Sequence, residues 1–161
     1  MADLFKIITS ELLTGEMKYY ATKVIIKGLQ QEESIWYSSC NICKSKVTIN
    51  EDVVHCAKCS KENIDYSLRY VLKLYVEDDT SNAIFTLSDS EAESIISVPV
   101  SELENIKVTS IEEYIKIVKN SCDKEMTFII KAKDKICGNR TFRSLTVQSI
   151  KKDSHEINHG I

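Results

Sequence analysis

Two Cys-x-x-Cys pairs, separated by twelve residues, lie in the segment "CNICKSKVTINEDVVHCAKC" at positions 40–59. The first pair is Cys40 and Cys43, and the second is Cys56 and Cys59. Each such turn brings two thiolates to one ion, and two turns supply the tetrahedral sulfur shell that Zn²⁺ prefers. The spacing predicts one structural Zn²⁺ in a zinc ribbon over about residues 36–62. Because four thiolates close the shell, no position remains for an activated water, and the site is expected to be structural.

Two alternatives to zinc stay open for these four thiols, an iron–sulfur cluster and redox dithiols. A thioredoxin-like site does not fit, because no βαβ pattern surrounds either pair. His55 adjoins Cys56 but is expected to lie beside the site, since the cysteine set is already complete. Cys122 and Cys137 stand apart and are expected to be ordinary free thiols. Six cysteines behind an N-terminus without a secretory leader point to a reducing, intracellular compartment.

Alternating apolar and polar residues predict five strands, at residues 16–29, 66–78, 82–88, 125–135 and 140–152. Acids in the first turn and helical spacing predict helices at 88–96 and 110–120. The ribbon falls between the first and second strands, and the helices fall between the third and fourth. This order predicts a mainly β fold, a five-stranded OB-fold barrel with a zinc-ribbon insert, and a generic α+β sheet is the alternative. Residues 1–152 are expected to form this single domain, with 153–161 as a disordered tail.

Charge is distributed unevenly along a chain whose net charge is −3. Residues 77–113 hold ten acids and one base, Lys107, whereas residues 126–152 hold seven bases and one acid, Asp134. A basic surface could therefore steer a polyanion despite the acidic total, although solvated strand and helix faces would give the same counts. No apolar run reaches the roughly 18–20 residues of a membrane helix. No phosphate loop or nucleophile elbow is present, so the protein is expected to be non-enzymatic, with no small-molecule substrate.

Basic and aromatic residues form a second candidate site, for nucleic acid. Single-stranded nucleic acid is held by cations that follow the phosphates and by flat side chains that stack on the bases. Candidates of both kinds lie on strand faces turned away from the predicted core, in the third strand, and at the last hairpin. They are Lys23, Lys27, Arg69, Lys73, Tyr75, Phe85, Lys131, Lys133, Arg140, Phe142 and Arg143. Core packing is the alternative for each ring, and it is favoured for Phe85 and Tyr70.

Five stretches of the chain carry a family resemblance when they are taken in order. They are "WYSSCNICKSKV" (36–47), "HCAKC" (55–59), "LRYVLKLYVED" (68–78), "AIFTLSDSEAESII" (83–96) and "MTFIIKAKDKICGNRTFRSLTVQSI" (126–150). They resemble the two knuckles, the second and third barrel strands, and the closing hairpin of one domain. That domain is the C-terminal OB domain of the replication protein A large subunit, in plant-type or divergent form. The resemblance spans roughly residues 4–152.

The resemblance implies a zinc-bearing OB domain that binds single-stranded DNA in the nucleus. Such a domain belongs to a replication protein A-like factor for replication, repair, recombination or telomere maintenance. Other replication protein A-like subunits are the expected protein partners, and RNA stays open as a ligand beside DNA. The resemblance also assigns the four ribbon cysteines to the metal, and Arg69 with the third-strand region to the binding groove.

Two features depart from the family pattern. Ile84 and Ser88 stand where the family has aromatic residues, which leaves Phe85 as the nearby ring and predicts lower DNA affinity. The family also continues into a helix that assembles a heterotrimer, whereas this sequence ends in "DSHEINHGI". An isolated domain, a stand-alone relative or a truncated chain is therefore expected, and the trimer role is not carried over.

The main rival hypothesis is a protein-interaction module of the same fold, favoured by the acidic segment 77–113. A metal- or thiol-dependent enzyme is a third hypothesis.

Overall fold

The computed structural model describes residues 1–13, 15–30 and 35–151. The helices in this part of the chain are α1 (Leu4–Thr9), α2 (Asp89–Ile96), α3 (Val100–Thr109) and α4 (Ile111–Lys119). The strands are β1 (Met17–Leu29), β2 (Trp36–Cys40), β3 (Thr48–Asn50), β4 (Val53–Cys56), β5 (Lys61–Glu62), β6 (Tyr66–Tyr70), β7 (Leu72–Glu77), β8 (Asn82–Leu87), β9 (Glu125–Cys137) and β10 (Arg140–Lys151).

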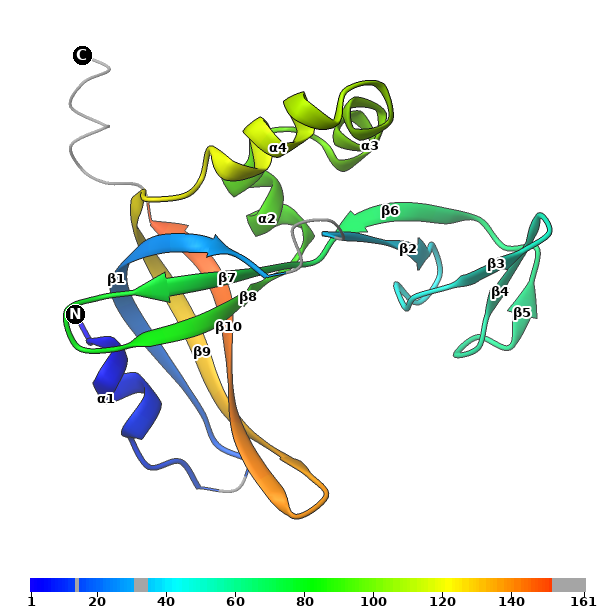
Figure 1. Ribbon diagram of the computed structural model, residues 1–161. Helices are drawn as coiled ribbons and strands as arrows, with labels where there is room; N and C mark the ends of the chain where they lie inside the picture. Colours follow the sequence, from blue (N-terminus) through cyan, green and yellow to red (C-terminus); the bar gives the residue numbers. More distant parts are fainter. Residues whose placement is uncertain (14, 31–34, 152–161) are drawn as a thin grey trace.

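Five of these strands close into a barrel in the order β1-β7-β8-β10-β9 (Figure 1). All neighbours in the barrel are antiparallel except β8 and β10, whose parallel pairing at Thr86 and Thr146 closes it. Leu72, Leu74 and Val76 of β7 are buried, and the residues between them are exposed. The period-two pattern of the sequence thus builds the core. The barrel is the predicted five-stranded OB-fold.

The predicted second strand, residues 66–78, is two strands rather than one. β7 belongs to the barrel, but β6 pairs with β2 in a separate sheet, and the change occurs at Val71. At this break the Tyr70 N–H donates to the Asp89 carboxylate at 2.8 Å, and the Val71 N–H donates to the Ile35 carbonyl. A strand keeps its alternation when it exchanges partners, so the pattern concealed the change. Together β2 and β6 form an arm that carries the ribbon away from the barrel (Figure 1).

The ribbon is a small unit inserted between β1 and β7, as the sequence predicts. Its strands β3, β4 and β5 form a three-stranded antiparallel sheet. Cys40, Val47 and Cys56 are buried in a cluster of their own, which is separate from the main core. Because this apolar cluster is so small, the ribbon needs an additional source of stability, such as a metal ion.

Helical segments between β8 and β9 lie where the sequence predicts them, and they pack against the barrel core. Ser110 caps α4 through its hydroxyl. The helix α3 is not among the predicted elements, since Leu103 is its one fully buried residue and no apolar stripe marks it. The short α1 is also additional. Asp3 caps its first turn, and Leu4 and Ile7 reach the barrel core.

The predicted disordered tail, 153–161, lies outside the described residues. None of the described helices has the length and apolar character that crossing a bilayer requires. The main core is continuous from α1 through the barrel to α4, so these elements position one another.

Candidate metal centre and nucleic-acid interface

The four predicted cysteine ligands converge in the ribbon. The Sγ atoms of Cys40, Cys43, Cys56 and Cys59 all lie within 4.8 Å of one another, and all four residues are free thiols. The Cys40 and Cys59 sulfurs are 3.9 Å apart, and those of Cys43 and Cys56 are 3.5 Å apart. Sulfurs placed tetrahedrally at a Zn–S distance of about 2.3 Å would lie about 3.8 Å from one another. The arrangement therefore fits one tetrahedral metal ion, and His55 is not part of the group.

The backbone of each knuckle bends around its sulfurs. The Ile42 N–H donates to Cys40 Sγ at 3.3 Å, and the Cys59 N–H donates to Cys56 Sγ at 3.4 Å. Such N–H donors stabilise a negatively charged sulfur. The residue after each pair adopts a left-handed φ, 65° at Lys44 and 54° at Ser60. Both knuckles therefore hold their sulfurs in a shape suited to thiolates.

Two of these thiols have strongly shifted pKa values. Hydrogen bonds from the backbone and hydroxyl of Ser45 lower the pKa of Cys43 to about 6. Hydrogen bonding to Cys43 and burial raise the pKa of Cys59 to about 12. Metals bind the thiolate, so binding would displace the proton of Cys59. The pKa values of these two thiols are thus shifted in opposite directions, that of Cys43 towards the thiolate and that of Cys59 towards the thiol.

The arm of the ribbon is fixed to the barrel and to the helices. Arg69 of β6 donates from Nε to Ser39 Oγ of β2 at 3.1 Å. Its terminal nitrogen lies 3.9 Å from the carboxylate of Asp89, the first residue of α2. The Trp36 ring of β2 packs edge-on against Tyr114 of α4, with the centroids 5.9 Å apart. These contacts set the position of the ribbon beside the barrel.

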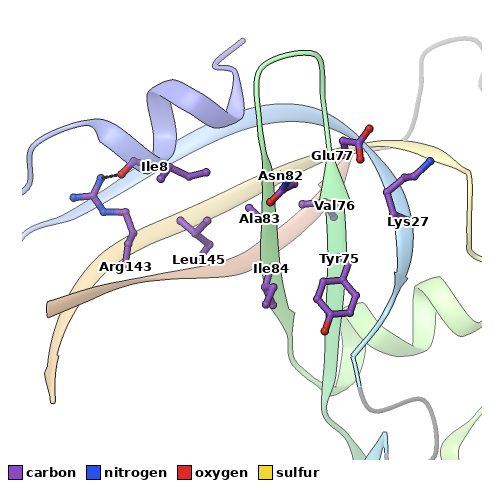
Figure 2. Close-up of a pocket in the computed structure, with 10 residues that line it drawn as sticks. All are labelled: Ile8, Lys27, Tyr75, Val76, Glu77, Asn82, Ala83, Ile84, Arg143 and Leu145. Carbon is purple, nitrogen blue, oxygen red and sulfur yellow. Dashed lines mark hydrogen bonds between the residues drawn. The ribbon is translucent and has the colours of Figure 1, made fainter. Parts of the chain in front are cut away.

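The outward faces of β7 and β8 carry a groove with two hollows. The first hollow has a volume of about 630 Å³ and extends across β7 and β8 from Lys27 to Arg143 (Figure 2). Tyr75 and Ile84 are cross-strand neighbours in it, 43% and 40% exposed. A flat ring beside an apolar side chain offers a base a surface on which to stack. The Lys27 ammonium at the margin is 3.6 Å from Asp123.

The second hollow, of about 460 Å³, lies between the barrel and the arm and is lined by Arg69 and Thr86. Thr86 is two residues from the first hollow along β8, and Lys73 is its cross-strand partner, so the hollows share one face. Tyr37 and Lys44 also line this hollow but are not predicted site residues. The sequence alone does not identify Tyr37, because it reaches the groove only through the pairing of β2 with β6. Of the predicted residues, Lys27, Arg69 and Tyr75 therefore line the groove, and Lys73 lies on the same face beside Thr86.

Two predicted contacts are corrected by the structure. Phe85 is fully buried, and its ring centroid lies 5.8 Å from that of Phe128 in the core, so it cannot stack on a base. Side chains along β8 alternate between the core and the outside, and Phe85 is at a position that faces the core. Arg143 borders the first hollow, but its guanidinium binds Asp134 at 2.8 Å and the backbone carbonyls that end α1. Its donors are engaged within the protein, and we assign it a structural role.

The other predicted cations and rings lie away from the groove. Lys23 of β1 forms an ion pair with Glu125 of β9 at 3.2 Å. Lys131 and Lys133 point outward from β9, and Phe142 is 50% exposed on β10. Arg140 begins β10 at the exposed hairpin end. None of these residues lines either hollow, so the predicted interface divides into a groove set and a hairpin set.

The sequence matches the model of one protein family, described as the replication factor-A C-terminal domain, over residues 19–159. A replication protein A 70 kDa DNA-binding subunit of Arabidopsis thaliana is 32% identical over 103 residues, which cover 62% of this chain and 17% of that protein. The replication protein A 70 kDa DNA-binding subunit of Xenopus tropicalis is 26% identical over 157 residues, covering 96% and 26% respectively. The chain thus spans only a small part of the length of these relatives.

Two solved structures share the fold. One chain of a replication protein A heterotrimer bound to ssDNA superposes with a TM-score of 0.77 at 19% identity, over 90% of this chain and 34% of that one. A chain of yeast RPA bound to ssDNA superposes with a TM-score of 0.73 at 22% identity, over 95% and 90%. At these identities the likeness establishes the architecture, including the barrel and its insert.

Proposed function

The chain belongs to the replication factor-A C-terminal domain family, and on this basis we propose that it is a non-enzymatic domain that binds single-stranded DNA. The proposal places it in the nucleus, within a replication protein A-like factor that acts in DNA replication, repair, recombination or telomere maintenance. Its protein partners would be the other subunits of that factor. The similar 70 kDa proteins of A. thaliana and X. tropicalis are DNA-binding subunits, which supports this assignment.

The observation that carries the proposal is the pairing of Tyr75 with Ile84 on the open face of β7 and β8. This face of an OB-fold is the one on which oligonucleotides commonly bind. Lys73 extends outward beside the pair, and Arg69 lines the neighbouring hollow. Single-stranded DNA that crosses the groove would place a base on Tyr75 and phosphates near these cations. Because Ile84 adds no second ring, the stacking contribution would be modest.

We also propose that Cys40, Cys43, Cys56 and Cys59 hold one Zn²⁺. The sulfur spacing and the N–H donors to Cys40 and Cys56 support this choice. A four-thiolate shell leaves no open position, so the ion would supply folding energy and no chemistry. Placing the ribbon correctly matters for binding, because Arg69 is held between the arm and the start of α2.

A titration of fluorescently labelled oligo-dT tests the DNA-binding proposal, at about 50 mM and about 200 mM salt. We expect binding that weakens with salt, because each phosphate contact releases counterions. Lys73→Gln and Tyr75→Ala should each weaken binding. Lys116→Gln on α4 is the matched control, because it removes the same charge far from the groove and should leave binding unchanged. No binding at low salt, or binding indifferent to salt, would overturn the proposal.

A second candidate function is a protein-interaction module of the same fold. Val108, Ile111 and Ile115 are exposed on α3 and α4, within or beside the acidic segment 77–113. These helices would repel DNA but could receive an apolar partner segment. Specific capture of a partner by protein that shows no affinity for single-stranded DNA would favour this function over DNA binding.

A further inference from the structure

The outward side chains of all five barrel strands align in one lateral row. Lys73 of β7 pairs with Thr86 of β8, Thr86 pairs with Thr146 of β10, Thr146 pairs with Lys131 of β9, and Lys131 pairs with Tyr19 of β1. Lys73, Thr86, Thr146 and Lys131 each stand between two buried neighbours and therefore face outward. Tyr19 is the cross-strand partner of Lys131 and is exposed on the same side. Four steps between adjacent strands make the row about 19 Å long. The row begins in the groove and continues onto the opposite face of the barrel.

The far end of this row widens into a basic and aromatic face. Lys131, Lys133 and Lys135 stand at every second position of β9, about 6.8 Å apart. Tyr19 lies beside Lys131 and is 58% exposed. Phe142, which is half exposed, lies across from Lys135. Cations alternating with exposed rings on a flat sheet are the elements that hold single-stranded nucleic acid.

Electrostatics distinguish this face from the groove. In the part of the chain that the structure describes, none of the ion pairs involves the three lysines of this face. In the groove, by contrast, Arg69 lies near Asp89, Lys27 near Asp123, and Glu77 lines the first hollow. The outward positions of 17–21, 129–135 and 142–146 carry no carboxylate. The three lysines of this face therefore lack the nearby carboxylates that Arg69 and Lys27 have in the groove.

We propose that single-stranded nucleic acid bound in the groove continues over β10 onto this face, where Lys131 and Lys133 contact phosphates and Tyr19 stacks on a base. The two threonines in the row, Thr86 and Thr146, form an uncharged crossing between the two cationic ends. This inference rests on the proposed function and extends it, since it assigns a second contact surface to the same strand. Binding should accordingly strengthen with oligonucleotide length beyond what fills the groove.

Oligonucleotide length separates the two surfaces experimentally. The probes are labelled oligo-dT of about 6 and about 16 nucleotides, within the range of site sizes for an OB-fold. The double variant Lys131→Gln/Lys133→Gln should bind the longer probe about ten-fold more weakly at low salt and bind the shorter probe as the wild type does. Losing two phosphate contacts should also reduce the slope of log K against log salt by about 1.4 for the longer probe.

Further variants make the test specific. Tyr19→Ala should weaken binding of the longer probe about five-fold or more without changing the salt slope, because it removes a ring and no charge. The matched control is Lys116→Gln/Lys119→Gln on α4, which removes the same charge and should leave both probes unaffected. Circular dichroism melts verify that every variant folds.

Each outcome bears on a different claim. If Lys131→Gln/Lys133→Gln binds both probes as the wild type does while Lys73→Gln is weakened, the second surface is wrong and the groove proposal stands. An equal loss for both probes also contradicts the inference, because the lysines would then act on the groove itself. If neither the wild type nor any variant binds either probe, the proposed function fails as a whole.

Discussion

The Arg143 guanidinium and the Asp134 carboxylate face each other across the β9–β10 hairpin through two parallel hydrogen bonds, Nε to Oδ1 at 2.8 Å and Nη2 to Oδ2 at 3.1 Å. The remaining terminal nitrogen of Arg143 donates to the carbonyls of Ile7, Ile8 and Ser10 at the end of α1. A cation at the C-terminal end of a helix is favourable, because the unpaired carbonyls there carry partial negative charge. The pair thereby holds the N-terminal helix against the barrel.

Arg143→Ala should destabilise the protein by about 2–3 kcal/mol, because it leaves Asp134 and several carbonyls without a charged donor. Arg143→Lys should recover only part of this, since an ammonium cannot reproduce the paired geometry. Urea denaturation of each variant measures the change. Arg140→Ala is the control, because Arg140 is exposed and should change stability by less than about 0.5 kcal/mol. Equal losses at Arg140 and Arg143 would contradict the structural role of Arg143.

The same pair predicts a pH dependence. Hydrogen bonds from Arg143 lower the pKa of Asp134 below its ordinary value. Such a carboxylate contributes stability above its unfolded pKa of about 3.9, and the contribution is lost as the pH falls through the lowered folded value. Asp134→Asn should therefore be less stable than the wild type near pH 7, and the difference should shrink below about pH 4.

Urea denaturation of wild type and Asp134→Asn at about pH 7 and about pH 3 measures this difference. Subtracting one protein from the other cancels the acid sensitivity that both share, including any loss of metal from the ribbon. A difference that stays constant or grows towards low pH would show that Asp134 does not gain its stability from ionisation.

Removing the proposed zinc should unfold the ribbon and leave the barrel folded, because the two units bury separate clusters. About 10 kcal/mol of apparent binding free energy is typical of structural zinc, far more than Cys40, Val47 and Cys56 can supply by burial. Hydrogen exchange should show loss of protection in β3–β5 on chelation or in Cys56→Ser, with β7–β10 still protected. Cys137→Ser, at an exposed cysteine of the hairpin, should retain one zinc per chain and full protection. Unchanged exchange in the ribbon after the metal is removed would refute the prediction.

Ile84→Tyr should strengthen binding of single-stranded DNA about five-fold or more, because it places a second ring beside Tyr75 in the groove. Ile84 is exposed, so the larger side chain fits without disturbing the core. The same oligo-dT titration measures the gain. Ile115→Tyr, at a similarly exposed position on α4, adds a ring outside the groove and should have no effect. An affinity equal to that of the wild type would show that bases do not pass over Tyr75.

Local patterns were sufficient to predict the cluster of four cysteines and most of the barrel. The cysteine spacing predicts the four clustered sulfurs because both turns are short and each is determined by its own residues. Alternation predicts the barrel strands because inward positions must be apolar. The helix α3 was beyond such prediction, since Leu103 alone is fully buried and its other contacts come from neighbouring elements.

Which predicted cations share a surface was decided only by the tertiary structure. The sequence marks Lys73, Arg143 and Lys131 alike as cations on strands. Barrel closure places Lys73 on the face of the groove, whereas it turns Arg143 inward to α1. Lys131 lies beyond β10, on the opposite face of the barrel. The exchange of partners at Val71 is equally invisible in the sequence, although it sets the arm and the second hollow. The physical reason is that period and spacing fix how each segment presents its side chains, whereas strand pairing fixes which segments meet.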